Sequence, residues 1–504
     1  MKKLATLLLC LLMLISAPLA MASCGDEQQG TVITTAGKTE DLAPGATQDP
    51  EAGLYDGLVP KSYDDEVVHI LNADSDWGLV IMDTDTISTP IDSAIFARNS
   101  VIEDNLEVDI QVTQMDYQAV NSTIYNQVAG NLYQYDICYN QSRKQNALVV
   151  QGVFKSANSY EQHLDFSKPW WYDDIITELT ASNNLYLIAG DMNMMVNDSL
   201  WCMAFNVDII NKYGEKSPYD LVYEGNWTYE ELYRLSKETR AEGKYGIVSH
   251  IAFADALLKG AGLGFTTRDE DGNLMRASFD DRFVTVYQKM VEYFFTNNEM
   301  GGENGIRTHY DSENYTSGKF NTSIYNHHNE FTAGNATFHA GTVGDMRVYM
   351  PSSEIEYGIV PIPKYEASQK QHVSYMYSAA SLCGIPANID SEPDGTLERV
   401  CTVMEWMCAY SYKLVKPVYY EVILYGRISR QPQAVDMLKI VFGLTENGVK
   451  SVEMDDILQL GMSTWMEKYA SDGKPNISSK LRSLTEIVNE KIDEILTYYE
   501  ENRP

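Results

Sequence analysis

The chain has 504 residues and a formal net charge of −33 at pH 7, from 71 acidic and 38 basic side chains. Such a surface repels phosphate backbones, so nucleic acid is excluded as an expected partner, and anionic ligands are disfavoured unless a local basic pocket overrules the average. About 440 residues follow the N-terminal region, too many for one ordinary hydrophobic core, so two lobes are expected.

The N-terminus has the order of charged, apolar and small residues that is typical of a secretory signal. Lys2 and Lys3 precede an apolar run over residues 4–15, which is too short to span a bilayer comfortably. Removal of both lysines with the signal would change the formal charge from −33 to −35, because residues 1–23 contain no acidic residue.

Two cleavage sites compete at the end of this run. The tripeptide "AMA" at residues 20–22 fits an ordinary small-x-small site. The sequence "MASC" ends at Cys24 and resembles a bacterial lipobox, in which the cysteine thiol is acylated before cleavage, although Met21 stands where such boxes usually have leucine. We expect residues 1–23 to be a signal peptide and Cys24 to be the lipidation site.

Residues 24–62 are expected to form a flexible, lipid-anchored linker. They are rich in Gly, Thr, Pro, Gln, Asp and Glu, and they contain too few large apolar residues to fold. A flexible coil of about 37 residues has a root-mean-square span of roughly 35 Å. The remainder of the chain would therefore stay near a membrane while moving freely above it.

Strand-like and helix-like segments alternate after the linker. In chain order they are "VVHILN" (67–72), "PIDSAIFARNSVIEDNL" (90–106), "EVDIQVTQM" (107–115), "YQAVNSTIYNQVAG" (117–130) and "YDICYN" (135–140). This strand-helix-strand-helix-strand order predicts a parallel sheet flanked by helices, with ligands beyond the carboxyl ends of the strands. The segments "ADSDWG" (73–78) and "CYNQSR" (138–143) follow two of these strands and matter most for binding.

A second set of strands and helices begins after about residue 188. "GNWTYEELYRLSKE" predicts a helix that Thr228 caps, with Glu231 completing a capping box. "KYGIVSHI" predicts a short strand. From Ser451 onward the chain is expected to be helical throughout.

A hairpin is expected within "RDEDGNLMRASF", turning at Asp271 and Gly272. The run over residues 269–273 has the look of a calcium loop but lacks the downstream glutamate that such a loop needs, so the hairpin is the better interpretation.

The spacing of the cysteines indicates neither disulfide bonds nor a metal site. Once Cys10 and Cys24 are set aside, five remain, an odd number without CxxC spacing, so neither a disulfide framework nor a zinc motif can be assigned. We expect buried free thiols, no metal and no cofactor. The five are Cys138, Cys202, Cys383, Cys401 and Cys408.

Several segments resemble a known family when taken in order. They are "DFSKPWW" (165–171), "FNVDIINKYGEKSPYDLVYEGNWTYEELYRLSKE" (205–238), "FTAGNATFHAG" (331–341), "YGIVPIPKYEASQKQHV" (357–373) and "KPVYYEVIL" (416–424). Each is weak alone, but together they cover most of residues 63–504. The chain resembles the bacterial extracellular solute-binding proteins of family 1, the lipid-anchored components of ABC importers that capture sugars in Gram-positive bacteria.

The resemblance implies an α/β fold of the two-lobed, type II periplasmic-binding-protein kind, with a hinge between the lobes and a ligand cleft at their interface. Lobe 1 would hold residues 63–178 and 376–430, and lobe 2 would hold residues 188–370 and 431–504. The chain would cross between lobes near residues 175–187 and 373–382.

The residues expected at the sugar site follow strands or stand where the resemblance implies a cleft. A pyranose presents C–H faces to aromatic rings and hydroxyls to polar side chains, so aromatic and polar residues should alternate there. The candidates from lobe 1 are Asp74, Asp76, Trp77, Asp136, Tyr139, Asn140, Trp170 and Trp171, and those from lobe 2 are Trp201, Ser249, His250, Gly341 and Thr342.

Among the aromatic candidates, Trp77 and Trp201 are expected to stack on the sugar from an open cleft. Trp170 and Trp171 are adjacent, so an extended segment would point one into the core and the other into the cleft. Trp227, Trp406 and Trp465 are expected to pack in the core. His250 fits either a ligand contact or a local hydrogen bond.

The resemblance thus implies capture of a mono- or oligosaccharide by a monomer on the outer face of the cytoplasmic membrane, and delivery to ABC transporter permease subunits, without catalysis. Two alternatives stay open: a secreted glycosidase, which would need two carboxylates about 5 to 10 Å apart, and a sugar sensor or adhesin that takes no part in transport. No HExxH, GxSxG or Walker motif supports an enzyme.

Overall fold

The chain forms two compact units, Met1–Val59 and Pro60–Pro504. The computed structural model describes residues 53–73, 87–241, 244–250, 252–269, 272–276, 279–295, 307–308, 326–421, 432–452, 466, 469–470 and 472–504. The predicted signal peptide, Cys24 and most of the predicted linker lie outside these residues, as do Asp74, Asp76, Trp77 and Trp465. None of the described helices combines the length and apolarity needed to cross a membrane.

The first sheet has the order β12-β3-β1-β2. β1 is parallel to both β2 and β3, and its register places Val68 opposite Ile110 and Leu71 opposite Cys138, all of them buried. The predicted parallel arrangement is therefore confirmed. β12 joins the edge antiparallel to β3, which the local pattern did not indicate. The strands are β1 (Glu66–Ala73), β2 (Val108–Met115), β3 (Ile137–Gln141) and β12 (Ser381–Gly384).

Helix α2 has the bounds that the sequence predicts, Pro90–Leu106. Thr89 caps it by accepting from the backbone N–H of Asp92, and Asp92 accepts in return from the Thr89 N–H at 2.8 Å. Pro90 at the first helical position has no N–H to leave unpaired there. Local chemistry alone sets this boundary.

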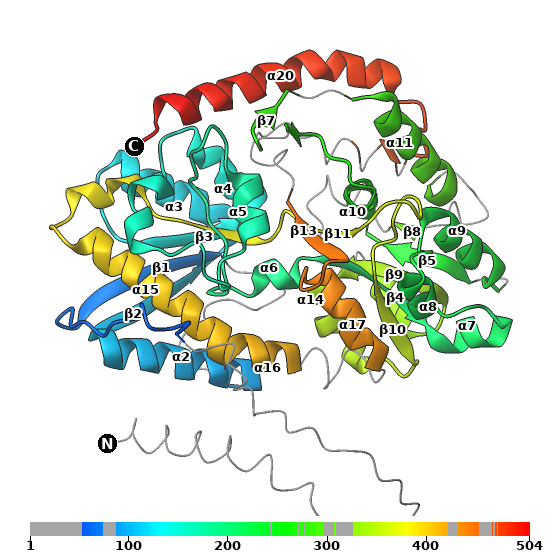
Figure 1. The fold of residues 1–504 in the computed structure, drawn as a ribbon, viewed down its shortest axis with the longest axis horizontal. Coiled ribbons are helices and arrows are strands. Elements are labelled where there is room, and N and C mark those ends of the chain that lie inside the picture. Colours follow the sequence, from blue (N-terminus) through cyan, green and yellow to red (C-terminus); the bar gives the residue numbers. More distant parts are fainter. Residues whose placement is uncertain are drawn as a thin grey trace, which may run out of the picture. The chain divides into compact units, whose positions relative to one another are not determined.

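Helices cover the first sheet and extend from it. They are α2, α3 (Tyr117–Ala129), α4 (Ser142–Val149), α5 (Asp173–Leu179), α15 (Thr396–Tyr410) and α16 (Lys416–Glu421), with a π-helical turn at Ser411–Val415 between the last two. Figure 1 shows these helices around the blue strands β1 and β2.

The second sheet has the order β10-β4-β9-β5-β8. β9 is parallel to β5 and antiparallel to β4, so the start of β4 and the ends of β5, β9 and β10 share one edge. Its strands are β4 (Trp201–Asn206), β5 (Tyr245–Ser249), β8 (Arg307–Thr308), β9 (Ala336–Thr342) and β10 (Tyr357–Pro361).

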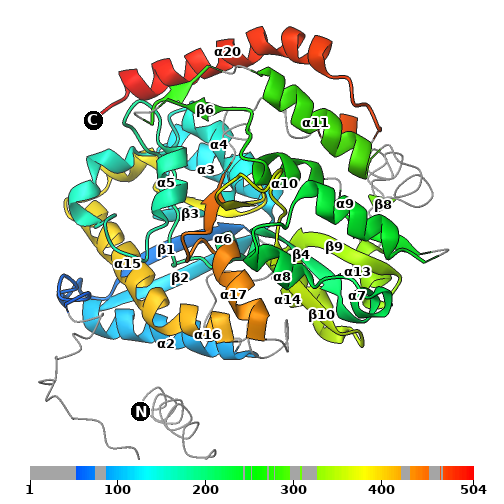
Figure 2. The same cartoon turned by 45° about the vertical axis from the view of Figure 1, so that its right-hand side comes forward.

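Helices surround that sheet (Figure 2). They are α7 (Val207–Tyr213), α8 (Pro218–Tyr223), α9 (Tyr229–Glu238), α10 (Phe253–Gly260), α11 (Asp281–Phe294), α13 (Asn326–Thr332), α14 (Val343–Tyr349) and α17 (Pro432–Val441). Within Pro60–Pro504, we call the first sheet with its helices the first body and the second sheet with its helices the second body. Two short sheets complete the fold: the predicted hairpin of β6 (Thr267–Arg268) and β7 (Leu274–Met275), and the parallel pair β11 (His372–Tyr375) and β13 (Gly448–Ser451).

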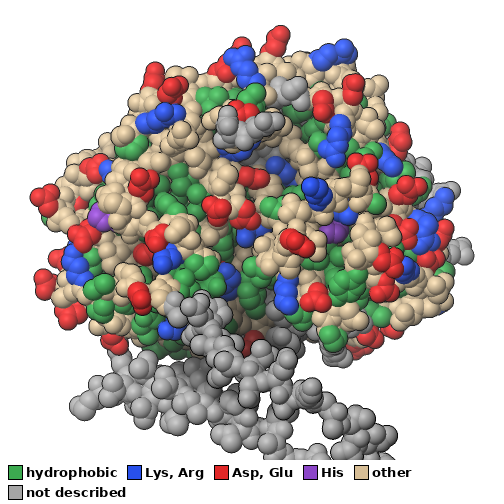
Figure 3. All heavy atoms as spheres, in the orientation of Figure 1, with side chains coloured by type: hydrophobic (Ala, Val, Ile, Leu, Met, Phe, Trp, Pro, Cys, Tyr) green, Lys and Arg blue, Asp and Glu red, His purple; other side chains and the backbone are tan. Residues whose placement is uncertain are grey.

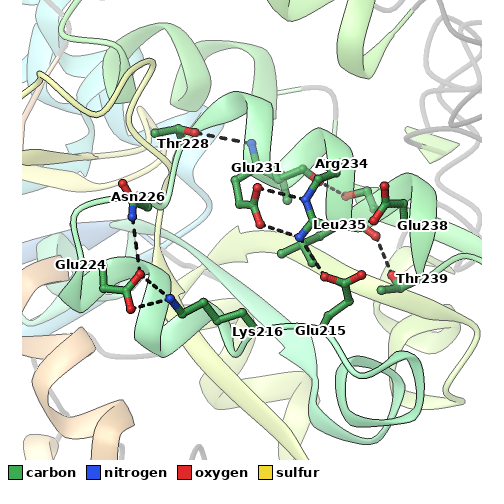
Figure 4. A network of polar contacts seen from close by, with 12 residues as sticks. Glu215, Lys216, Glu224, Asn226, Thr228, Glu231, Arg234, Leu235, Glu238 and Thr239 are labelled. Atoms are coloured by element: carbon green, nitrogen blue, oxygen red, sulfur yellow. Dashed lines mark hydrogen bonds and ion pairs between the residues drawn. The ribbon is translucent and has the colours of Figure 1, made fainter.

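Helix α9 begins at the predicted cap, because the Thr228 hydroxyl accepts from the backbone N–H of Glu231. The predicted capping box is only half formed, since the Glu231 carboxylate accepts from Arg234. One turn further, Arg234 binds Glu231, Glu215 and Glu238 in a surface network (Figure 4). Exposed ion pairs of this kind contribute about 0–1 kcal/mol each, so the network orients α9 more than it stabilises the fold. Acidic and basic side chains are also interspersed over the face in Figure 3.

Two chain segments pass side by side between the bodies. An isolated antiparallel bridge joins Leu200 to Met376, and a second joins Ile188 to Cys383. The short helix α6 (Met195–Asp198) lies in the first of these segments. We refer to residues 188–200 and 376–381 as the crossing segments.

The C-terminal region is only partly helical, so the expectation of helix throughout from Ser451 is wrong. Ser451 ends β13, which pairs with β11 some distance back in the chain, and residues 472–477 are turn and coil. The helix that follows, α20 (Ser478–Glu501), lies above both bodies in Figures 1 and 2. Its ring Tyr499 packs on Tyr186, while Asp493 pairs with Arg276 of the second body.

The core agrees with the sequence for two tryptophans and all five remaining cysteines. Trp227 is fully buried and its Nε1–H donates to the Pro361 carbonyl at 2.8 Å, and Trp406 is buried and stacks on Tyr410. The five cysteines are free and buried.

Trp170 and Trp171 do not diverge as predicted. The segment turns, with the Trp171 N–H bonded to the Lys168 carbonyl, so the alternation of an extended strand does not apply. Both indole N–H groups donate to Glu405 on α15, at 2.8 and 3.1 Å, and both rings are buried in the first body. Burial raises the pKa of Glu405 to about 7, although these bonds oppose the shift.

This carboxyl predicts a pH dependence of stability. Folded Glu405 keeps its proton up to about pH 7, whereas the unfolded side chain loses it near 4.5. The contribution of Glu405 to the free energy of unfolding is therefore fully present below pH 4.5 and is lost as the pH rises to about 7. We compare the free energies of unfolding of the wild type and of Glu405→Gln. The advantage of the wild type over the variant should fall by up to about 3 kcal/mol between pH 4.5 and pH 7.

Urea unfolding of both proteins at several pH values checks this. His250 and His372, whose pKa values burial lowers to about 4, respond to pH in the opposite sense but equally in both proteins, so they cancel in the difference. A constant difference for Glu405→Gln would contradict the prediction.

Candidate functional site

One edge of the second sheet gathers five of the predicted sugar-site residues. Trp201 begins β4 directly opposite Thr342, the last residue of β9, and Gly341 precedes Thr342. Ser249 ends β5 on the same edge, and His250 follows it. The carboxyl ends of β5 and β9 therefore bring these residues together, as expected for a ligand site beyond the carboxyl ends of parallel strands.

The first sheet reaches the crossing segments through the start of α4. Ser142 donates through its Oγ to the Ser378 carbonyl at 3.0 Å, and the Arg143 N–H donates to the same carbonyl at 3.2 Å. Next to Ser378, the ring of Tyr377 meets the indole of Trp201 edge-on, with 6.1 Å between centroids. Residues from both sheets thus converge on one crossing segment.

We call this convergence the junction site and define it by Arg143, Trp201, His250, Asp345 and Tyr377. The charges in it interact across the two bodies. Burial lowers the pKa of His250 to about 4, the Asp345 carboxylate opposes that shift, and the Arg143 guanidinium adds to it. The charge of Arg143 in the first body therefore acts on His250 in the second.

Trp201 carries an unused hydrogen-bond donor. Only 2% of the residue is exposed, because Phe253 stacks on its ring and Tyr377 covers its edge. Its Nε1 is buried and has no hydrogen-bond partner among the described residues. A buried N–H without an acceptor costs about 1–3 kcal/mol, so it is an indication of a missing acceptor. The expectation that Trp201 faces an open cleft is nevertheless wrong in this structure.

His250 offers a second donor. Its Nδ1 accepts from the Ala252 N–H at 3.2 Å, so the neutral ring carries its proton on Nε2. With a pKa near 4 the ring stays neutral at pH 7. The two roles considered from the sequence are thus compatible: one ring nitrogen makes a local hydrogen bond and the other can donate.

The remaining candidates in the second sheet serve local structure. The Ser249 Oγ donates to the Ala340 carbonyl at 2.8 Å. Thr342 caps α14, and its N–H donates to Asp345 Oδ2 at 2.8 Å. A Cβ at Gly341 would lie 2.7 Å from the His339 ring, so this position needs glycine for close packing.

The candidates in the first sheet do not join the junction site. Asp136 comes just before β3, and Gln141 lies at the other end of that strand. The Asp136 carboxylate accepts from the His69 N–H and the Tyr133 hydroxyl, both at 2.7 Å. Tyr139 is buried opposite Cys383. The Asn140 amide bonds to Asn121 and to the next backbone N–H.

Three residues of the junction site were not singled out from the sequence. Arg143 falls in the segment "CYNQSR" that was expected to follow the third strand, but β3 runs one residue further than predicted, so the first residues beyond it are Ser142 and Arg143. Tyr377 and Asp345 come from other parts of the chain, and no local pattern marks them.

A small, mostly apolar cavity lies away from these residues, between α10, α11 and β11. Leu258, Phe265, Phe283 and Tyr375 contribute to its lining. It contains none of the predicted sugar-site residues.

The fold is that of known binding proteins. One similar structure is an ABC substrate-binding protein from Listeria monocytogenes in complex with cycloalternan (12% identity, TM-score 0.54, 86% of this chain and 99% of that one). Another is UgpB from Mycobacterium tuberculosis in complex with glycerophosphocholine (12%, 0.54, 80% and 96%). A third is the cyclic alpha-maltosyl-1,6-maltose binding protein from Arthrobacter globiformis (11%, 0.53, 86% and 99%).

These identities establish the fold alone. The chain has the two-lobed, mixed α/β fold of type II periplasmic binding proteins, as the sequence predicts. No family model matches the chain, and no curated protein does.

Proposed function

We propose that the protein is an extracellular solute-binding protein that captures a carbohydrate and delivers it to an ABC transporter permease. The observation that carries the proposal is the indole N–H of Trp201, which is buried where the two bodies meet and has no hydrogen-bond partner among the described residues. It stands in a fold whose similar structures include proteins bound to cycloalternan and named for a cyclic maltosyl-maltose.

The chemistry of the junction site suits a neutral polyhydroxyl ligand. The site has three donors, which are Trp201 Nε1, His250 Nε2 and the Arg143 guanidinium, and one acceptor, the Asp345 carboxylate. Hydroxyls of a ligand can therefore both accept and donate hydrogen bonds there. The Tyr377 ring adds an aromatic surface. Asp74, Asp76 and Trp77 come after β1 in the sequence, lie outside the described residues and remain predicted contributors.

The division into lobes is part of this proposal. Lobe 1 holds residues 63–178 and 376–430, and lobe 2 holds residues 188–370 and 431–504. The end of α20 contacts Asn184 and Tyr186, which lie in the segment that links the two lobes. A ligand that contacts both lobes would favour their closed arrangement over an open one.

A glycosidase is the second candidate, and the described acids favour it less. Two fully buried carboxylates near the crossing segments are engaged by cations: Asp191 by Lys416 at 2.9 Å, and Asp198 by Arg347 at 2.7 Å. Burial raises the pKa of both carboxyls, and the paired cations oppose that shift. The pairing occupies each carboxylate, whereas a general acid must be free to pass its proton to a substrate. A sugar sensor would share the site and differ only in its partner.

A thermal-shift screen of the purified full-length protein tests the proposal. Mono- and oligosaccharides, including maltotriose, form one arm, and glycerophosphocholine forms the rival arm. A ligand that binds only the folded state adds about 2.7 kcal/mol at a hundredfold excess over its dissociation constant. A clear rise in melting temperature with a sugar supports carbohydrate capture; a response to glycerophosphocholine alone would overturn it.

The proposed anchor has its own prediction. Cys24→Ala should abolish acylation, so that the protein leaves the detergent phase or remains uncleaved, whereas the native protein should partition with membranes. Ser23→Ala keeps the thiol and should behave as the native protein. Mature native protein that begins at Ser23 and carries no lipid, shown by mass spectrometry, would rule out the anchor.

A further inference from the structure

Three of the chain's eight histidines meet in one buried cluster beside the second sheet. His327 and His328 lie on α13, and His339 lies on β9. Each can offer one ring nitrogen such that the three atoms lie within 4.8 Å of one another, and all three residues are at least 96% buried. We call these residues the histidine cluster.

His339 is the least satisfied member of the cluster. Both of its ring nitrogens are buried and lack a hydrogen-bond partner within the described part of the chain. One nitrogen of a neutral imidazole is a donor and the other an acceptor, so two strong polar groups go unused in a dry interior. Such an arrangement costs free energy unless something binds the ring.

Ring contacts hold the cluster in place. The rings of His327 and His339 stack with 5.4 Å between centroids, and Tyr349 stacks on His328 with 4.1 Å between centroids. A neutral imidazole has the free lone pair that a metal needs.

A carboxylate stands at the side of the cluster. Asp345 Oδ1 lies 3.8 Å from His328 Nε2, while its Oδ2 accepts the Thr342 N–H. Gly341 permits this approach, because a Cβ there would lie 2.7 Å from His339 Cε1 and 2.9 Å from Asp345 Oδ2. The three imidazoles therefore have a carboxylate beside them at His328.

We propose that the histidine cluster binds one transition-metal ion of the Zn²⁺ class, with Asp345 within reach as a fourth ligand. Imidazole nitrogens favour Zn²⁺, Cu²⁺ and Ni²⁺ over Mg²⁺ and Ca²⁺, and four such ligands suit tetrahedral Zn²⁺. Zn–N bonds of about 2.1 Å place tetrahedral ligands about 3.4 Å apart. Nitrogens within 4.8 Å reach that spacing by small side-chain rotations.

The ion would join three elements of the second lobe. It would fix α13 to β9 through the histidines and tie in α14 through Asp345, which caps that helix with Thr342. Thr342 pairs with Trp201 across the sheet. The metal would thus brace the edge that carries the junction site and would share Asp345 with it, while the three histidines lie outside that site.

The test uses full-length protein without an added histidine tag, stripped with EDTA, dialysed and titrated with Zn²⁺ by calorimetry. We expect one Zn²⁺ per chain and a higher melting temperature with the metal. His339→Gln should weaken Zn²⁺ binding at least tenfold. His372→Gln is the matched control: it removes another buried histidine, whose Nδ1 bonds to the Ile362 carbonyl outside the cluster, and should bind Zn²⁺ as the wild type does.

A second variant and a second readout cover the case in which His339→Gln fails to fold. His328→Gln removes a different ligand and should show the same loss. Co²⁺ bound to the wild-type cluster should give the strong visible absorption of a tetrahedral site, and Zn²⁺ should displace it. The proposal is overturned if the wild type binds no Zn²⁺, or if both variants bind it as tightly as His372→Gln does, which would make the cluster stacked aromatic packing only.

Discussion

Arg347→Met is expected to lower the free energy of unfolding by about 3–5 kcal/mol, because it leaves a fully buried carboxylate without its cation. Asp198 on α6 has no exposed side-chain surface and bonds to Arg347 of α14 at 2.7 Å. The Tyr419 hydroxyl of α16 donates to the other carboxylate oxygen at 2.8 Å. One acid in a crossing segment thus joins helices of both bodies, and Tyr419 cannot compensate its charge.

Urea unfolding at pH 7 measures this effect. Arg276→Met is the matched control, since it removes an arginine from an exposed pair with Asp493 and should change the free energy by no more than about 1 kcal/mol. Asp198→Leu combined with Arg347→Met should recover part of the loss, because no buried charge then remains. Equal effects of Arg347→Met and Arg276→Met would contradict this account of the crossing segments.

Trp201→Phe is expected to weaken sugar binding by about 2 kcal/mol, roughly 30-fold, with little change in stability. The substitution keeps an aromatic ring against Phe253 and Tyr377 but removes the Nε1–H, which has no partner among the described residues. No hydrogen bond within the described part of the chain is lost, so the melting temperature should stay close to that of the wild type. Trp201→Ala is less informative, because removal of a buried tryptophan costs about 3–5 kcal/mol by itself.

Trp227→Phe gives the opposite pattern and serves as its control. This substitution breaks the hydrogen bond to the buried Pro361 carbonyl and should lower stability by about 1–3 kcal/mol, while sugar affinity stays unchanged. Affinities come from calorimetry with the sugar that the thermal screen identifies. If Trp201→Phe binds that sugar as well as the wild type, the junction site is not where the sugar binds.

The sequence predicted the elements whose signals are local. Thr89 and Pro90 mark the start of α2, and Thr228 marks the start of α9, because caps and first turns depend only on neighbouring residues. The parallel pairing of β1, β2 and β3 followed from their alternation with helices. Ser451 was misassigned because its strand exists only by pairing with β11.

The site was less predictable because its members are set by distant contacts. Trp170 and Trp171 share Glu405 as an acceptor across 235 and 234 residues of chain, and nothing near either tryptophan indicates that acid. Trp201 was chosen correctly as a residue of the edge, but its burial depends on Phe253 and Tyr377. The histidine cluster has no motif spacing, since α13 and β9 bring it together.

The most direct test of carbohydrate capture is a calorimetric titration of the full-length protein with the best sugar of the screen, followed by recovery of the sugar and analysis of its chain length. Binding by the two lobes without chemistry predicts saturation at one sugar per chain and recovery of the sugar intact. Absence of saturable binding to any sugar, or recovery of shortened products, would contradict it.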